Sequence, residues 1–381
     1  MLAIKNAKIV LENKIVSNGV LLVDNGQIID FGCTQSVVIP EECETFDAKG
    51  DFVGPGFVDI HCHGGGGFSL CENPVEASKH FLKHGETTVL STFYTTVSKQ
   101  KFLENIALFK LEKRKNRIKN IYGFYMEGPY MNPKYGASPD LNKWLDKISA
   151  EDYKEFVDEL GNLAFVWAIA PEREGITEFL EYAKFVNPNA VIAIAHSEAT
   201  PTEAAKVKKY GVTLQTHCTN ATGCINRAAG VRSCGPDEIC FLDDEMYAEI
   251  ICDSQGIHVE PEMLKLILKI KGRDRVILIS DSFVSNEPTP KEFEHITDIS
   301  FDASGNLSGS KLTLDVACKN MIMHTACSIC DAFAFASTNP ARAIGLDNEI
   351  GSIAKNKKAN LVLVDDDFNV KNVILEGEIV C

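Results

Sequence analysis

Positive charge is scarce in this chain. Its 381 residues include 38 Lys and Arg against 53 Asp and Glu, so the formal net charge is -15 at pH 7. A field of that sign repels phosphate backbones, which argues against nucleic acid as a partner. An anionic small molecule must therefore find a local basic pocket.

Long apolar runs are also missing. No segment approaches the length of a membrane span, and residues 1–6 alternate like a strand and lack the apolar core of a signal peptide. The 13 Cys are odd in number and follow no disulfide framework. We therefore expect no membrane partner and a cytoplasmic protein with reduced thiols.

The middle of the chain alternates apolar strands with amphipathic helical stretches, as in an α/β fold with a parallel sheet. The predicted strands centre on residues 57–58, 88–90, 122–124, 165–167, 191–194, 212–214, 248–251 and 276–279. Because eight strands are the number that closes a barrel, we predict a (β/α)8 TIM barrel.

Both ends of the chain are rich in short strands instead. Strand-like runs occupy residues 7–10, 20–23 and 27–29 near the start, and 359–364 and 373–380 near the end. This pattern predicts one small β-sandwich domain built from residues 1–52 and 346–381, around a barrel domain of residues 53–345.

Polar side chains of one kind follow five of the predicted barrel strands. They are His61 and His63, Glu127, His196, His217, and Asp281. In a closed barrel the carboxyl ends of all strands converge on one face, where active sites lie. A lone His-x-His pair is more often a surface or core feature, but five strands that deliver such residues in phase predict a shared site.

These residue types are suited to a divalent metal ion. Residues two apart in extended chain point the same way, so His61 and His63 can face one ion. Glu127 can bind or bridge ions, His196 and His217 can add nitrogen ligands, and Asp281 can act as an acid/base carboxylate. We expect one or two ions, and zinc, iron and manganese suit such ligands equally.

The same positions resemble those of the amidohydrolase superfamily, and in particular the N-acetylglucosamine-6-phosphate deacetylase family. The resemblance spans nearly the whole chain. It includes Pro-Gly-Phe-Val-Asp at 55–59, Glu-Gly-Pro at 127–129, Ala-Pro-Glu at 170–172, Asn-Ala at 220–221 and Gly-Ile-His-Val at 256–259. The predicted fourth strand, 164–170, has no Lys that could bridge two metals when carboxylated, and Glu127 can supply that carboxylate.

The resemblance implies a metal-dependent hydrolase that converts N-acetylglucosamine-6-phosphate to glucosamine-6-phosphate and acetate. Glu127, His196 and His217 would hold the main metal, His61 and His63 would complete a second site, and Asp281 would move the proton. The implied substrate-binding residues are Ala137, Asn220, Ala221, His258 and Arg227.

The phosphate contact implied by the resemblance involves a His and an Arg. His258 and Arg227 match the residues with which the family holds the phosphate, and the Arg often comes from the partner subunit of a homodimer. Arg232, five residues after Arg227, is a competing candidate.

Four departures from the family pattern leave the substrate open. Ser138 stands where the family usually has a sugar-contacting His, and the other departures are at Thr222, Ala228-Ala229 and Ser282-Phe283. We predict that these positions lie in substrate-facing loops, while the metal ligands are unchanged. A different N-acyl amino sugar, or another amide or cyclic amide, is therefore an alternative substrate. A non-catalytic relative that only binds ligands is a further alternative, although such relatives tend to lose metal ligands.

Overall fold

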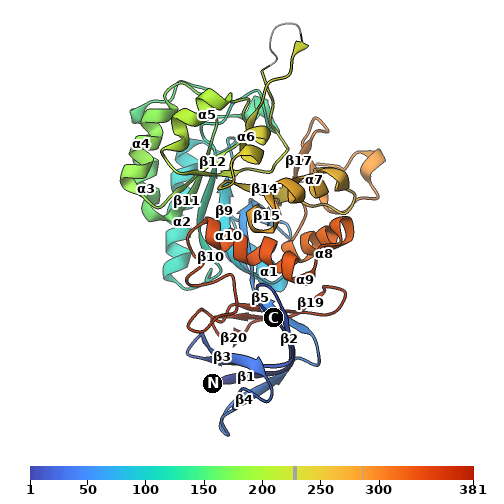
Figure 1. Cartoon of the computed structure of the whole chain (residues 1–381). Coiled ribbons are helices and arrows are strands. Elements are labelled where there is room, and N and C mark those ends of the chain that lie inside the picture. Colours follow the sequence, from blue (N-terminus) through green and yellow to red (C-terminus); the bar gives the residue numbers. More distant parts are fainter. Residues whose placement is uncertain (226–229, 286) are drawn as a thin grey trace.

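A computed structural model describes residues 1–225, 230–285 and 287–381. It places an α/β barrel above a small β sheet that contains both termini, as Figure 1 shows. Each barrel strand is followed in the chain by a helix, so the predicted (β/α)8 fold is confirmed. In the part of the chain that is described, no helix is both long and apolar enough to cross a membrane.

The barrel strands form one parallel sheet in the order β15-β14-β13-β12-β11-β10-β9-β6. They are β6 (Phe57–Cys62), β9 (Glu86–Phe93), β10 (Ile121–Glu127), β11 (Ala164–Ile169), β12 (Val191–Ile194), β13 (Val212–Gln215), β14 (Tyr247–Ile251) and β15 (Val276–Ile279). Backbone hydrogen bonds from Asp281 N to His61 O (2.9 Å) and from His63 N to Ser282 O (2.8 Å) join the two ends of this sheet. Helices cover the outer face, so most strand positions are buried and mostly apolar, with buried polar residues such as Asp59, Thr88 and Glu249 among them.

The helices around the barrel are amphipathic. They are α1 (Pro74–Lys83), α2 (Lys99–Arg114), α3 (Ala150–Leu160), α4 (Ile176–Val186), α5 (Pro201–Lys208), α6 (Pro236–Leu242), α7 (Pro261–Lys271) and α8 (Leu314–Thr325). In α3 the buried side chains are Tyr153, Phe156, Val157 and Leu160, which recur at the spacing of one helix face. Helix α5 begins with a capping box between Thr200 and Glu203.

Two segments interrupt or follow this alternation. Between β15 and α8 the chain forms a hairpin of β16 (Ile299–Phe301) and β17 (Leu307–Ser310), and another short hairpin, β7 (Gly64–Gly65) and β8 (Phe68–Ser69), follows β6. After α8 come α9 (Ile329–Phe333), a π-helical turn over Ala334–Thr338, and α10 (Asn339–Ala343).

The small sheet draws strands from both ends of the chain, in the order β20-β19-β18-β5-β1-β2-β3 with β4 beside β1. Its strands are β1 (Leu2–Val10), β2 (Ile15–Asp24), β3 (Gln27–Cys33), β4 (Glu44–Asp47), β5 (Phe52–Pro55), β18 (Leu361–Val364), β19 (Val370–Leu375) and β20 (Glu378–Ile379). Leu21 and Ile28 from the first strands share one core with Leu363 and Ile374 from the last. The domain boundaries at residues 52 and 346 stay a prediction.

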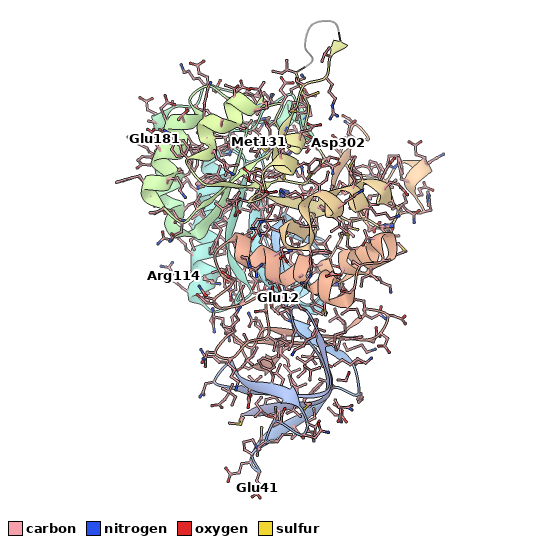
Figure 2. All side chains as sticks on the ribbon, viewed as in Figure 1. Glu12, Glu41, Arg114, Met131, Glu181 and Asp302 are labelled. Carbon is pink, nitrogen blue, oxygen red and sulfur yellow. The ribbon has the colours of Figure 1, made fainter. Side chains whose placement is uncertain are left out.

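The small sheet is packed firmly against the barrel. Phe57 of β6 stacks on Phe333 and Phe368, with ring centroids 5.6 and 6.1 Å apart. Figure 2 shows Glu12 at this junction, where its carboxylate lies 3.4 Å from the guanidinium of Arg342. The sheet thus buttresses the amino ends of the barrel strands, and the carboxyl ends are left for a site.

Candidate metal centre and active site

The six polar residues predicted at the strand ends do meet. They form one group at the carboxyl end of the barrel, buried except for the partly exposed His63, which we call the histidine–carboxylate cluster: His61, His63, Glu127, His196, His217 and Asp281. Each lies in the last two residues of a barrel strand or at most two residues beyond its end. His196, His217 and Asp281 have positive φ angles of 43°, 29° and 46°, so the chain turns sharply where they leave their strands.

Glu127 lies between two groups of ligand-type atoms. Its Oε1 is 2.8 Å from His196 Nε2 and 3.1 Å from His217 Nε2. Its Oε2 is 3.1 Å from His63 Nε2 and 3.4 Å from His61 Nε2. The carboxylate therefore presents one oxygen to each side of the cluster.

Asp281 completes the second side. Its Oδ1 lies 3.2 Å from His63 Nε2 and 3.4 Å from His61 Nε2. Unlike His61, which is fully buried, Asp281 also borders the pocket above the cluster. It can therefore reach both a bound ion and a substrate.

The geometry of the cluster fits a divalent cation. The Nε2 atoms of His196 and His217 are 3.0 Å apart, and both face Glu127 Oε1. Ligands about 2.1 Å from a tetrahedral ion lie about 3.4 Å from one another, which is close to the spacings seen here. On the other side of Glu127, His61 Nε2 is buried without a hydrogen-bond partner among the described residues. The cluster thus offers two sets of ligand atoms that share the Glu127 carboxylate, an arrangement that suits two neighbouring cations.

The charges of the cluster agree with this interpretation. Burial raises the pKa of Glu127, but the imidazoles of His61, His196 and His217 more than offset it and hold the pKa well below its usual range. Burial lowers the pKa of His196, which favours the neutral ring. Burial also favours the neutral rings of His61, His63 and His217, but the carboxylates of Glu127 and Asp281 more than offset it and raise their pKa, so protons compete with a cation for these rings. An ionised carboxylate and a neutral imidazole are the forms that bind metal.

A pocket of about 500 Å³ opens directly above the cluster. Its sides, which we call the pocket wall, consist of Tyr94, residues 136–139, Asn220, Ala221, His258, Phe283 and residues 306–309. The predicted substrate-binding residues Ala137, Asn220, Ala221 and His258 all lie in this wall. Residues 306–309 come from the end of the β16–β17 connection and from β17 itself. Figure 2 shows Asp302, at the start of this connection, at the end of the barrel away from the small sheet.

Gly136 is the point where the loop after β10 passes closest to the cluster. Its φ is +103°, and a Cβ atom there would lie 2.5 Å from His196 Nδ1 and 2.6 Å from the Tyr94 hydroxyl. Only glycine fits this approach. Tyr94 in turn donates a hydrogen bond to Ala137 O (2.9 Å), which fixes the loop over the pocket.

His258 is held by Asp253. Its Nδ1 lies 3.1 Å from Asp253 Oδ2, and its Nε2 donates to Gly309 O at 3.1 Å. Burial raises the pKa of Asp253, but hydrogen bonds from the ring and backbone of His258 and from the backbone of Ile257 lower it to about 2. The ring edge that faces the pocket therefore contacts a backbone carbonyl, which an anionic ligand would have to replace.

Asn220 offers a hydrogen-bond donor through its side chain. Its backbone N–H already donates to His217 O at 2.6 Å. Its side-chain Nδ2 is buried with no hydrogen-bond partner among the described residues. The amide group of the side chain is thus the free donor.

Neither of the two arginines considered for the phosphate contact is among the described residues that line the pocket. Arg227 and the departure Ala228-Ala229 lie outside the described residues. Arg232 pairs with Glu238 and does not border the pocket. No Lys or Arg in the described parts of the chain lines this pocket.

Two of the departures from the family pattern do not face the substrate space. The Thr222 hydroxyl donates to Asp237 Oδ2 at 2.7 Å, and the Ser282 hydroxyl donates to Gly64 O at 2.7 Å. Neither side chain lines the pocket, although the loops that carry them border it through Ala221 and Phe283. Ser138 and Phe283 do line it, and they are the described departures that can alter specificity.

Sequence reasoning missed several residues of the site. Tyr94 follows the second strand, and its polar side chain just past a strand end is the signal that could have revealed it. Glu249 and Tyr125 are buried inside the barrel beside His61, with nothing in their local pattern to mark them. Residues 306–309 come from the hairpin after β15, which the sequence shows only as a turn-rich segment.

Comparison with known proteins supports the same assignment. Residues 52–380 match the Amidohydrolase family. The chain is 28% identical to the N-acetylglucosamine-6-phosphate deacetylase of Bacillus subtilis (strain 168), over 99% of this chain and 96% of that protein. It is 27% identical to the N-acetylgalactosamine-6-phosphate deacetylase of Escherichia coli O157:H7, over 85% of this chain and 86% of that protein.

Among solved structures, the N-acetylglucosamine-6-phosphate deacetylase of Pasteurella multocida superimposes with a TM-score of 0.85 at 25% identity, over 100% of this chain and 99% of that one. The predicted resemblance is therefore confirmed over the whole length of the chain. The match to the family covers both the barrel and the C-terminal strands of the small sheet. This chain belongs to the amidohydrolase family.

Proposed function

We propose that this protein is a metal-dependent hydrolase that removes the acetyl group from N-acetylglucosamine-6-phosphate, giving glucosamine-6-phosphate and acetate. The observation that carries the proposal is the position of Glu127, with one oxygen toward His196 and His217 and the other toward His61 and His63, at the floor of a pocket that Asp281 also borders. The full-length similarity to deacetylases of 6-phosphorylated amino sugars supports the substrate class.

In this proposal the cluster holds one or two divalent ions, of zinc, iron or manganese. Glu127, His196 and His217 hold the main ion, and His61 and His63 complete a second site that shares Glu127. When bound, the ion supplies a Lewis acid for the acetamide carbonyl and for the attacking water. The geometry of the residues does not choose among the three metals.

Asp281 moves the proton. As the water oxygen bonds to the carbonyl carbon, Asp281 accepts the proton that the water loses. As the C–N bond breaks, Asp281 returns this proton to the amide nitrogen, which leaves as the amine. One water is consumed, and the products are acetate and the amino sugar.

The pocket wall positions the sugar phosphate. His258 and the Asn220 side chain supply donors from the described chain, and Ala137 and Ala221 contact the sugar. Arg227 remains the predicted guanidinium ligand of the phosphate, supplied across the interface of a homodimer. No Lys or Arg is among the described wall residues, which supports a phosphate-binding side chain from outside this part of the chain.

We place this activity in the cytoplasm, where the 13 free cysteines would stay reduced.

Acetate release tests the proposal directly. Protein loaded with zinc, iron or manganese is assayed with N-acetylglucosamine-6-phosphate, with its galactosamine epimer and with unphosphorylated N-acetylglucosamine. The epimer is included because the relatives named for the two sugars match at nearly equal identity. We expect the highest kcat/KM with N-acetylglucosamine-6-phosphate and the lowest without phosphate. Absence of acetate release with every metal and both phosphorylated sugars would refute the proposal.

A further inference from the structure

A carboxylate that does not line the pocket lies beneath the histidine–carboxylate cluster. Glu249, on β14, has no exposed surface. Its Oε2 accepts a hydrogen bond from the Tyr125 hydroxyl at 3.2 Å and lies 3.4 Å from Nδ1 of His61. A buried carboxylate is costly unless it is hydrogen-bonded, so its place beside one ring of the cluster calls for an explanation.

The two nitrogens of His61 face different partners. Nδ1 points to Glu249, whereas Nε2 lies 3.4 Å from both Glu127 Oε2 and Asp281 Oδ1 and has no hydrogen-bond partner among the described residues. A carboxylate can only accept, so Nδ1 carries a proton in this contact. In the neutral ring that metal binding requires, Nε2 is then the atom with the free lone pair, and it faces the space shared with His63 and Glu127.

A second contact fixes Glu249 itself. The Tyr125 hydroxyl lies 2.6 Å from Thr216 Oγ1, and the Tyr125 ring packs on His61 with centroids 4.4 Å apart. Since Tyr125 donates its proton to Glu249, Thr216 donates to Tyr125. The chain Thr216–Tyr125–Glu249–His61 therefore runs across the barrel interior, and each donor has an acceptor.

The other side of the cluster does not use this chain. Nδ1 of His217 donates to Asn220 O at 3.2 Å, and neither His217 nor His196 has a hydrogen bond to Glu249. The two sides therefore differ in what orients their imidazoles: a backbone carbonyl at His217 and a buried carboxylate at His61.

We propose that Glu249 is a positioning residue that fixes the tautomer and orientation of His61 and thereby gives the His61–His63 side of the centre its own divalent ion. A carboxylate partner also raises the basicity of an imidazole ligand, and loss of such a partner typically weakens metal binding about 10- to 100-fold. The inference rests on the metal site of the proposed function but not on the identity of the substrate.

Metal titration tests this inference without any substrate. Metal-free full-length protein is titrated with Co²⁺, and bound metal is measured by visible absorption and by elemental analysis. We expect wild type to bind two equivalents. Glu249→Gln, which keeps the shape but removes the charge, should bind the first equivalent as wild type does and the second about 10- to 100-fold more weakly. Tyr125→Phe should weaken only the second equivalent, by a smaller factor.

Two controls make the result specific. Glu86 is another fully buried carboxylate of the barrel, on β9, whose Oε1 accepts from Leu314 N at 2.8 Å and which touches no cluster residue. Glu86→Gln should bind both equivalents normally. In a His61→Asn background, Glu249→Gln should have no further effect on metal binding, because its partner is gone.

The inference is overturned if wild type binds only one ion, if folded Glu249→Gln binds both ions as wild type does, or if it loses both equally. These outcomes are independent of the acetate assay. A protein that binds two ions but releases no acetate would refute the proposed function and leave the role of Glu249 intact.

Discussion

The histidine–carboxylate cluster and the pocket wall above it are built in different ways. Every cluster residue is fixed by a barrel strand that ends within two residues of it, and all but His63 are buried. The wall comes largely from the segments that connect the barrel strands to the next helices, including residues 136–139 and, from the β16–β17 hairpin, residues 306–309. Side chains at the strand ends are held rigidly, whereas the sequence of the loops can change without moving those side chains. The comparison teaches that reaction and substrate are specified by separable parts of this molecule.

Glu127→Gln should give the largest effect, because Glu127 is the one residue shared by both sides of the cluster. The amide cannot carry the charge that offsets two cations, so both metal content and turnover should fall. Loss of several kcal/mol of transition-state stabilisation corresponds to a decrease in kcat/KM on the order of 10³-fold or more. Elemental analysis and acetate release measure the two quantities. Full metal content in this variant would show that the carboxylate does not bridge.

Asp281→Asn should separate chemistry from metal binding. The amide cannot accept the proton of the attacking water, and the expected loss in kcat is about 10²- to 10⁴-fold, the usual contribution of a general acid–base. The ion on the His196–His217 side should stay bound, since Asp281 does not contact those nitrogens closely. A variant with metal and with wild-type kcat would remove Asp281 from the mechanism.

The sequence predicted the cluster well because its evidence is periodic. All eight barrel strands lie where apolar runs were found, and the residue that follows each run is fixed by register once the barrel closes. The contact between residues as distant as His61 and Asp281 follows from that closure alone. The topology of the barrel was therefore enough to predict that the cluster residues meet, without any prediction of loop structure.

The wall was predicted less well because loops have no register. Thr222 belongs to a loop that borders the pocket, but its side chain turns to Asp237, and Tyr94 was overlooked although it anchors the loop over His196. The contribution of residues 306–309 depends on how the β16–β17 hairpin folds back over the barrel.

The small sheet was expected from its strand patterns, but its pairing of β5 with β18 joins segments that the sequence separates by some 300 residues.

His258→Asn tests the wall at the side chain that Asp253 holds in place. Asn keeps a donor near Asp253 but ends short of the pocket, so one hydrogen bond to the anionic ligand is lost. A bond to a charged group contributes about 1.5–3 kcal/mol, so KM for the phosphorylated sugar should rise roughly 10- to 100-fold with little change in kcat. The unphosphorylated sugar is the control, and its kinetics should not change. An equal effect on both sugars would mean that His258 does not contact the phosphate.

Ser138→His should give the smallest effect and is the sharpest test of whether the wall can be altered independently. Ser138 lines the pocket with φ of 52°, a conformation that His tolerates better than most residues do, and its backbone N–H donates to Asp302 Oδ2 at 3.3 Å. The imidazole would restore the sugar contact that the family usually has at this position. One added hydrogen bond contributes about 0.5–1.5 kcal/mol, so KM should fall roughly two- to tenfold while kcat and metal content stay the same. Ser138→Ala is the matched control and should leave KM unchanged.

The contrary outcome is that Ser138→His raises KM for N-acetylglucosamine-6-phosphate while KM for the galactosamine epimer is unaffected. Ser138 would then mark a pocket shaped for a different sugar, so the wall would have diverged while the cluster kept its ligands.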